Sequence, residues 1–213
     1  MSTLEDLSSA VERGKKKEAL PLLQQCIDEG VDAKEILNEG LIPALDRVGE
    51  RFSKGEAFVP EMLVAARAMG ACTDVLKPYL AEAGSEPLGH GMIATVAGDM
   101  HDIGKNLVRM MLESNGFEIE DLGVDVPAEK ITGYLTEHPE CKIVCLSALL
   151  TTTMPALEAS VAAIKEAGLD EGRAIMVGGA PVTQEFADKI GADAYTADAS
   201  ACAAKAAELI ATL

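Results

Sequence analysis

The chain has no tryptophan and few other aromatic residues, with three tyrosines and four phenylalanines among 213 residues. Basic residues are also scarce, because 18 Lys and Arg stand against 35 Asp and Glu, which gives a net charge of −17. This charge opposes binding to nucleic acid or anionic lipid, and it suits either solubility or docking onto basic patches of partner proteins. The low aromatic content and the hydrophobic fraction of 48% favour a helix-rich globular protein.

Long apolar segments are missing as well. No run is long enough to span a bilayer, and the charges scattered through the first twenty residues predict that no signal peptide is present. The five cysteines are scattered and odd in number, which fits a reducing cytoplasm. Cys141 and Cys145 would lie too far apart along one strand for a disulfide, so we expect both to be small apolar fillers. The sequence therefore predicts a cytoplasmic protein.

The two halves of the chain differ in the period of their hydrophobic residues. Residues 1–83 show only helical periodicity, with stripes that indicate about four helices packed as a small bundle. The segment 84–91 belongs to a stretch rich in Gly, Ser, Pro and Glu and is predicted to be a linker. In residues 92–213, short apolar runs alternate with helical segments, which predicts an α/β domain. We expect a Rossmann-like, doubly wound parallel sheet of five strands in the flavodoxin-like order 2-1-3-4-5.

Polar and glycine-rich residues follow three of the predicted strands. The first strand runs into Asp99 and His101, the third into Ser147 and the threonines 151–153, and the fourth into Gly178-Gly179. Because the carboxyl ends of parallel strands meet at one edge, we expect these segments to line one ligand crevice. The predicted elements are strands over 92–97, 117–123, 142–147, 174–179 and 193–196, and helices over 103–115, 127–137, 154–167, 181–190 and the last segment up to Leu213.

The segment VAGDMHDIGKNLV (96–108) excludes several ligands. A dinucleotide fingerprint needs a glycine where His101 stands, and a receiver domain needs an aspartate at the end of the third strand. Zinc needs three or four ligands, which His90 and His138 are not spaced to supply. His101 beside Asp99 suits a single axial ligand to a macrocycle, since the carboxylate orients the ring. A corrinoid fits the crevice better than haem, although a histidine that only caps the following helix also explains the pattern.

Three motifs stand at the predicted strand ends in this order: Asp99-x-His101-x-x-Gly104, Ser147-x-Leu149 and Gly178-Gly179. With 42 residues between the first two and 28 between the last two, they resemble the cobalamin-binding signature of methionine synthase. They also resemble corrinoid methyl-carrier proteins of methylamine- and methanol-type methyltransferase systems. The segment RFSKGEAFVPEMLVAARAM (51–69) is similar to the helical cap of these proteins.

The resemblance implies that cobalamin binds with its own base displaced and with His101 as the cobalt ligand from below. It implies that Asp99 hydrogen-bonds His101 and that Thr153 takes the place of an outer serine hydroxyl. It implies that Phe52 and Val59, seven residues apart and so on the same side of a helix, lie over the upper cobalt face. The cofactor-binding residues that it implies in the second domain are Asp99, Met100, His101, Asp102, Ile103, Gly104, Val124, Ser147, Leu149, Thr151, Thr153, Gly178 and Gly179.

The resemblance further implies a carrier that is not an enzyme by itself. Because 213 residues leave no room for a substrate barrel, we expect a shuttle for methyl groups on cobalt. A substrate-specific methyltransferase would load the methyl group, and a second one would pass it to coenzyme M or tetrahydrofolate. A reductive activation protein is a further expected partner, and the linker is the candidate hinge of a mobile cap. We hypothesise that protonation of the Asp99–His101 pair favours release of the histidine.

The methyl donor cannot be read from the residues, because the partner enzyme recognises it; amines are favoured over methanol or methoxyaromatics. Three other functions carry the same module. A cobalamin-dependent regulator needs a basic DNA-binding domain, which this acidic chain lacks. The small subunit of a carbon-skeleton mutase usually has no helical bundle. A cobalamin store without a catalytic partner stays open.

Overall fold

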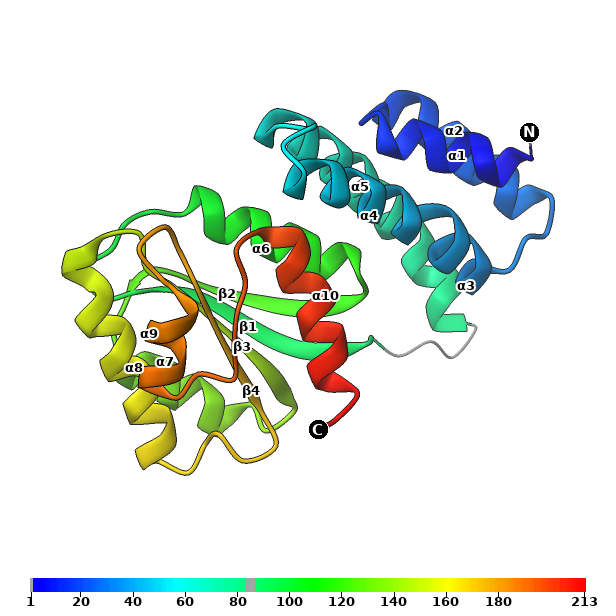
Figure 1. The fold of residues 1–213 in the computed structure, drawn as a ribbon. Helices are drawn as coiled ribbons and strands as arrows, with labels where there is room; N and C mark the ends of the chain where they lie inside the picture. The colour runs from blue at the N-terminus through cyan, green and yellow to red at the C-terminus, as the bar shows by residue number, and fades with distance from the viewer. Residues whose placement is uncertain (1, 83–86) are drawn as a thin grey trace. The chain divides into compact units, whose positions relative to one another are not determined.

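The structure is a computed structural model that describes residues 2–82 and 87–213 (Figure 1). The chain divides into two compact units. The first is built from helices α1–α5, and the second from a five-stranded sheet with helices α6–α10. Each unit has a hydrophobic core of its own, and the residues proposed above to bind the cofactor from below all belong to the second unit.

The helical unit is a four-helix bundle, as predicted. Its elements are α1 (Thr3–Glu12), α2 (Lys16–Asp28), α3 (Ala33–Glu35), the π-helical turn η1 (Ile36–Leu41), α4 (Ile42–Ser53) and α5 (Val59–Glu82). Because α3, η1 and α4 follow one another without a break, the unit has four rods, in which α1 and α5 each pack against both α2 and α4. The apolar stripes of the rods meet in a core where Leu23, Leu45 and Met69 are fully buried.

The expected placement of Phe52 and Val59 on one side of the same helix is wrong. Phe52 lies in the last turn of α4, whereas Val59 begins α5, so a turn separates the two residues. Gly55 in this turn has a φ of +73°, and its N–H donates to the carbonyl oxygen of Phe52 at 2.9 Å. A left-handed glycine directly after the last helical residues ends a helix, and the seven-residue spacing therefore spans two helices here.

The second unit contains the predicted parallel sheet. Its strands are β1 (Gly89–Val96), β2 (Phe117–Val126), β3 (Cys141–Ser147), β4 (Ala174–Gly178) and β5 (Ala194–Tyr195). Every neighbouring pair is parallel and the order is β2-β1-β3-β4-β5, which confirms the predicted topology. The switch point at the carboxyl ends of β1 and β3 is where such sheets place their ligands.

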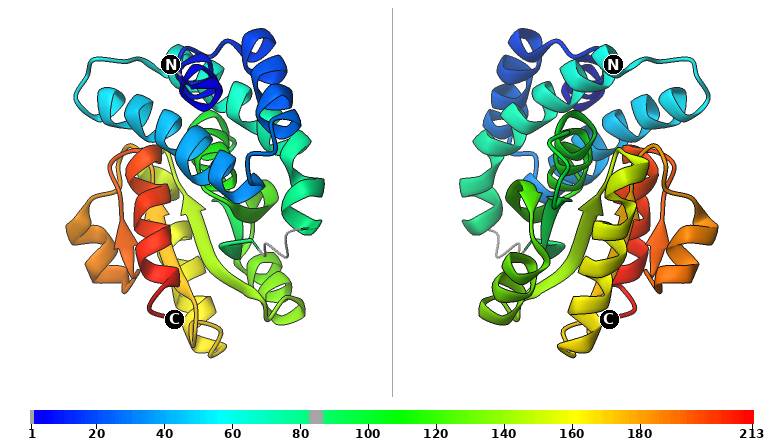
Figure 2. Two further views of the ribbon diagram at one scale, coloured as in Figure 1. Left: turned by 90° about the vertical axis from the view of Figure 1, so that its right-hand side faces the viewer. Right: turned by 90° about the vertical axis from the view of Figure 1, so that its left-hand side faces the viewer.

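Helices cover both faces of this sheet (Figures 1 and 2). They are α6 (Ile103–Ser114), α7 (Ala128–Glu137), the 3-10 turn η2 (Thr151–Thr153), α8 (Met154–Glu166), α9 (Gln184–Ile190) and α10 (Ala199–Ile210). Met92, Ala94 and Val96 of β1 pack into one core with residues of α7, α8 and α9. Since side chains alternate along a strand, Ile93 and Thr95 point to the opposite face, which α6 and α10 cover.

Some boundaries differ from the prediction. β1 begins at Gly89, before the predicted strand and inside the predicted linker, and residues 84–86 of that linker lie outside the described residues. α9 begins at Gln184 because Thr183 caps it, its hydroxyl oxygen accepting the N–H of Phe186 at 3.2 Å. α10 ends at Ile210. No helix among the described residues combines the length and the apolarity needed to cross a bilayer.

Candidate functional site

The site is built around a carboxylate without solvent exposure. Asp99 follows β1 and is 0% exposed. Its Oδ1 atom accepts hydrogen bonds from the ring Nδ1 of His101 at 2.7 Å and from the backbone N–H of the same residue at 3.1 Å. The His101 side chain is 50% exposed, and its carbonyl oxygen accepts the hydroxyl proton of Thr95 at 2.8 Å. Because Nδ1 donates to Asp99, Nε2 is the nitrogen that carries the lone pair for a ligand.

The other carboxylate oxygen of Asp99 is held by the loop after β3. Its Oδ2 atom accepts the backbone N–H groups of Leu149 at 2.7 Å and Leu150 at 3.3 Å. The Thr153 hydroxyl lies 2.8 Å from the same oxygen and 2.9 Å from the carbonyl oxygen of Leu150, so its single proton is shared between the two acceptors. The structure thus connects Thr153, Asp99 and His101 in one chain of hydrogen bonds.

These contacts keep the Asp99 carboxyl ionised. Burial by itself raises the pKa of the group, but the hydrogen bonds from Leu149, His101 and Thr153 outweigh burial and hold the pKa well below its usual range. Each of these donors stabilises the charged form. Asp99 is therefore an anion at neutral pH, and it supports a hydrogen bond that fixes both the tautomer and the direction of the His101 ring.

The loop after β4 completes this edge of the sheet. Ser147 and Gly178 are neighbours in the strand register, and the backbone N–H of Ala148 donates to the carbonyl oxygen of Gly178 at 3.1 Å. Gly179 has a φ of +131°, and a Cβ atom there would lie 1.8 Å from the carbonyl oxygen of Ala148. Only glycine permits this approach. The structure therefore brings the segments after β1, β3 and β4 together.

Large apolar side chains stand exposed around His101. Met100, directly before the histidine, is 69% exposed, and Ile103, two residues after it, is 73% exposed. In the loop after β3, Leu149 and Leu150 are each 40% exposed. Apolar side chains gathered beside a polar ligating group are typical of a binding surface. Leu150 is not among the predicted site residues; the only signal for it was a second leucine directly after Leu149.

The remaining predicted residues are placed as follows. Asp102 precedes α6, where its side chain accepts from the Asn106 amide at 3.2 Å, and Gly104 lies in the first turn of that helix. Val124 lies in the last part of β2, and Thr151 is exposed in η2. Phe52 and Val59 belong to the helical unit, where Val59 is 38% exposed.

Two residues near this edge were not predicted from the sequence. Lys105 of α6 is 4% exposed, and its ammonium group pairs with the carboxylate of Asp121 in β2. The signal for the pair was a lysine on the apolar face of a helix that should pack on the sheet. Asp125 in β2, which was not predicted either, has a positive φ of +53°.

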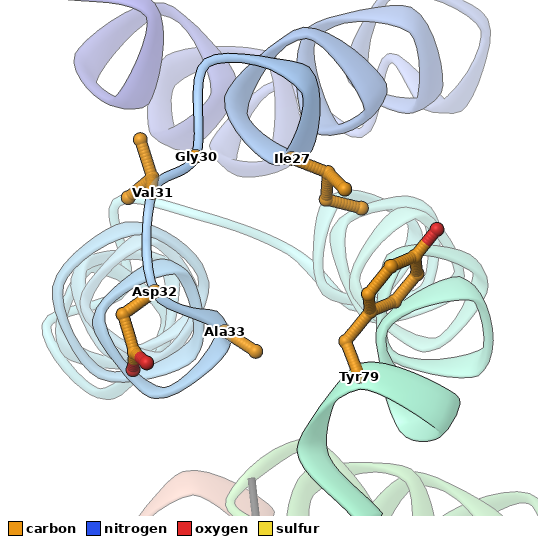
Figure 3. A pocket seen from close by; sticks show the side chains of 6 residues that line it. All are labelled: Ile27, Gly30, Val31, Asp32, Ala33 and Tyr79. Carbon is orange, nitrogen blue, oxygen red and sulfur yellow. The ribbon is translucent and has the colours of Figure 1, made fainter. Parts of the chain in front are cut away.

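A pocket of about 290 Å³ lies in the helical unit, and its lining contains none of the predicted site residues (Figure 3). Figure 3 shows the Tyr79 ring opposite the side chain of Ile27 and the segment that begins α3. Its one carboxylate, Asp32, already accepts the N–H groups of Lys34 and Glu35 as a helix cap. Among residues 2–82 and 87–213, no three His, Cys, Asp or Glu side chains are grouped to cage a bare metal ion.

Comparison with known proteins agrees with the motifs at the sheet edge. The sequence profile of the B12 binding domain matches residues 89–205, and a second profile with the same description matches residues 3–77. Dimethylamine corrinoid protein 1 of Methanosarcina acetivorans is 42% identical over 209 residues, which are 98% of this chain and 97% of that protein. The chain belongs to the corrinoid protein family.

Two solved structures of cobalamin proteins share the fold of this family member. A cobalamin-binding protein from Desulfitobacterium hafniense DCB-2 is 31% identical and has a TM-score of 0.83, with 97% of this chain and 98% of that chain covered. The methanol:cobalamin methyltransferase complex of Methanosarcina barkeri contains a chain that is 27% identical with a TM-score of 0.84, and the match covers 99% of this chain and 80% of that chain. Because B12 binding domain profiles match residues 3–77 and 89–205, this corrinoid protein binds cobalamin as its cofactor.

The residues at the sheet edge fit such a cofactor. A corrinoid brings its own equatorial nitrogen ligands, so the protein needs to supply only one axial donor, and His101 presents one with its Nδ1 atom already fixed. The exposed apolar side chains of Met100, Ile103 and Leu149 suit the face of a macrocycle. Gly178 at the end of β4 leaves room beside Ser147, because nothing lies within 4 Å of a Cβ atom built on it.

Proposed function

We propose that this corrinoid protein is the methyl carrier of a methyltransferase system and that His101 binds the cobalt of the cofactor through Nε2. The observation that supports this most is the 2.7 Å hydrogen bond between Nδ1 of His101 and the buried Asp99 carboxylate. When bound, the cofactor supplies a cobalt that accepts and donates a methyl group. The chain would supply the cobalt ligand, His101, and the hydrogen bond that orients it. It would also supply the proton that competes with cobalt for Nε2.

Asp99 and Thr153 set the state of the ligand. The Asp99 carboxylate holds Nδ1 in its protonated form, which leaves the lone pair on Nε2. Protonation of Nε2 would remove this lone pair, and the imidazole could then no longer hold the metal. The Thr153 hydroxyl donates to Asp99 Oδ2 at 2.8 Å, so it is the outermost group of the hydrogen-bonded chain. We assign it the role of adjusting the charge that Asp99 and His101 share.

The other residues of the site bind the rest of the cofactor. We assign the slot beside Ser147, Leu149, Gly178 and Gly179 to the displaced base and its nucleotide tail. Phe52 and Val59 of the helical unit are assigned to the upper face. The residues that we assign to the lower face and the edge of the corrin ring are Met100, Asp102, Ile103, Gly104, Val124, Leu150 and Thr151.

The ligand assignment is tested by a spectroscopic titration of the whole chain with hydroxocobalamin. The chain is expected to replace the benzimidazole by histidine and to change the visible spectrum accordingly. His101→Ala is expected to bind at least about tenfold more weakly and to lack the histidine-ligated form. His138→Ala, which loses an exposed contact to Glu140 and the stacking of its ring on Tyr134, serves as the control. An unchanged spectrum in His101→Ala would refute the assignment.

We further propose that an amine-specific methyltransferase loads the cobalt and that a second methyltransferase transfers the methyl group to coenzyme M or tetrahydrofolate. A reductive activation protein is a third proposed partner, which would restore the active form of the cofactor by reduction. Support comes from the 42% identity with a dimethylamine corrinoid protein, and the likeness to a methanol:cobalamin methyltransferase complex supports association with a methyltransferase. The acidic balance of 35 against 18 charged residues favours a basic docking surface on these partners.

The donor is identified by incubating the cobalamin-loaded chain with methyltransferases specific for dimethylamine, trimethylamine or methanol. Methylation of the cofactor, followed by its visible spectrum, is expected with an amine and its enzyme. If methanol with its methyltransferase were the only donor that methylated the cofactor, the choice of amines would be refuted. If no donor methylates the cofactor, the carrier function fails and a cobalamin store or regulator becomes the better explanation.

A further inference from the structure

Asp125, near the end of β2, has an unusual backbone. Its φ is +53°, and no other non-glycine residue has a positive φ in the part of the chain that the structure describes. Side chains other than glycine rarely adopt this conformation, although aspartate and asparagine tolerate it better than most. The side chain of Asp125 is exposed, so it fills no space in the core. Packing therefore does not account for the strained backbone.

Irregular pairing of β2 with β1 produces this conformation. Ile93 pairs with Asp121 and Val96 with Val126, so β2 advances five residues where β1 advances three. Such bulges turn a strand end toward a new direction and are frequent beside active sites. This one is anchored from α6, because Asp121 accepts the N–H of Gly123 at 2.9 Å with one oxygen and pairs with the buried Lys105 ammonium through the other.

The bulge orients Asp125 toward the loop that carries His101. The Oδ1 atom of Asp125 accepts the N–H of Gly98 at 2.7 Å. The backbone N–H of Asp125 donates to the carbonyl oxygen of Asp99 at 2.9 Å. One residue of β2 thus holds two successive residues of the loop after β1, and the left-handed φ is what lets its side chain and its backbone reach them together.

We infer that Asp125 is a positioning residue for His101, an inference that rests on the function proposed above. The loop after β3 holds the carboxylate of Asp99, whereas Asp125 holds the backbone of Gly98 and Asp99. Gly98, at a φ of +80°, is a flexible position without this support. The direction of the Asp99 carboxylate, and with it that of the His101 ring, is therefore set from two strands, β3 and β2.

The test uses the full chain and four variants. Asp125→Asn keeps an oxygen acceptor and a residue that tolerates positive φ, Asp125→Gly keeps the backbone but loses the acceptor, and Asp125→Ala loses both. Glu120→Gln removes an exposed negative charge from the same strand and serves as the control. Hydrogen exchange of the Gly98 amide is measured by NMR without cofactor, and the fraction of histidine-ligated cofactor is then measured in the hydroxocobalamin titration.

In Asp125→Gly and Asp125→Ala, the Gly98 amide is expected to exchange at least about tenfold faster, as for a lost hydrogen bond to a charged group. Asp125→Asn should stay within about threefold of the unmodified chain, and Glu120→Gln should match it. Amides in the middle of β1, such as that of Ala94, should keep their protection in all variants. The histidine-ligated fraction should fall in Asp125→Gly and Asp125→Ala and recover in Asp125→Asn.

Three results would overturn the inference. They are unchanged exchange at Gly98, faster exchange throughout β1, and faster exchange at Gly98 with an unaltered histidine-ligated fraction. The first shows no clamp, the second a general loss of stability, and the third a loop whose position does not affect the ligand. If the unmodified chain forms no histidine-ligated cofactor, the proposed function fails, whereas the exchange experiment still reports whether Asp125 holds the loop.

Discussion

Among the donors that surround Asp99, Thr153 is the only hydroxyl, and it lies 54 residues away along the chain at a distance of 2.8 Å. Thr153→Ala leaves Asp99 Oδ2 with fewer donors in a buried place, so we expect a loss of about 1–3 kcal/mol in the free energy of unfolding. Thr153→Ser keeps the hydroxyl and should lose only about 1 kcal/mol for the missing methyl group. Urea denaturation measures both values.

Thr152→Ala is the matched control, because Thr152 is the exposed neighbour of Thr153 in the same 3-10 turn. Its free energy of unfolding should stay within about 0.5 kcal/mol of the unmodified chain. If Thr153→Ser were as unstable as Thr153→Ala, the methyl group rather than the hydroxyl would be the important part of this side chain.

The Asp99 carboxyl also predicts a pH dependence of stability. Its pKa in the folded chain lies below the value of about 3.9 expected in the unfolded chain. The stability that ionised Asp99 contributes is fully present above the unfolded pKa and is lost as the pH falls toward the folded pKa. Urea denaturation between about pH 3 and pH 6 should therefore show a shallower decline in Asp99→Asn than in the unmodified chain.

The same comparison needs a carboxylate outside the site. Asp74→Asn removes an exposed group whose ion pair with Lys77 lies on the surface, and its decline with pH should match that of the unmodified chain. Equal slopes in Asp99→Asn and the unmodified chain would mean that the hydrogen bonds to Asp99 do not favour its charged form.

Single residues of the site differ in how well the sequence predicts them. The Asp99–His101 contact follows from a separation of two residues, which keeps the side chains close in any turn. The contact of Thr153 with Asp99 could be expected only through the resemblance to a family, because no local pattern connects residues 54 positions apart. The role of Asp125 was not foreseen, because residue type alone does not reveal a positive φ or a bulge in the partner strand.

At the scale of elements, helices and strands could be predicted because the helical stripes of the first half give way to short apolar runs that alternate with helical segments. Five such strand–helix units favour the flavodoxin-like strand order. The buried run of β3, which ends at Ser147, is an example. The turn between α4 and α5 was missed, since a seven-residue spacing of Phe52 and Val59 is compatible with one helix and with two. Gly55 was the available signal for the turn.

The turn after β4 gives the sharpest prediction at this scale. In Gly179→Ala, the new Cβ atom would lie 1.8 Å from the carbonyl oxygen of Ala148, at a φ that alanine rarely adopts. The β3 and β4 loops must then separate, and we expect a loss of about 3 kcal/mol or more in the free energy of unfolding. Gly178→Ala is the control with open space around the new atom, and it should cost less than about 1 kcal/mol.

Gly179→Ala also tests cofactor binding. Gly179→Ala should bind hydroxocobalamin at least about tenfold more weakly, because its loop contributes to the proposed slot. If Gly179→Ala and Gly178→Ala were equally stable and bound the cofactor equally well, the close approach of the two loops would have no energetic weight.

At the scale of the whole molecule, each unit buries apolar side chains in its own core, and the cysteines are distributed over both. Cys26 and Cys72 lie in the helical unit, whereas Cys141, Cys145 and Cys202 lie in the sheet unit, and all are buried. This agrees with the expectation that Cys141 and Cys145 are apolar fillers. The thiols therefore report on the intactness of both cores at once.

We expect the folded chain to react slowly with an aromatic disulfide reagent such as DTNB. Burial raises the pKa of the Cys72 and Cys141 thiols to about 11, so little thiolate is present at pH 8, and the side chains are also out of reach of the reagent. Thiol release, followed by absorbance, should stay below about one equivalent until urea unfolds the chain, and should then reach five. Rapid reaction of a thiol in the folded chain would show that one core opens locally, and the labelled cysteine, identified by mass spectrometry, would reveal which unit is the less stable.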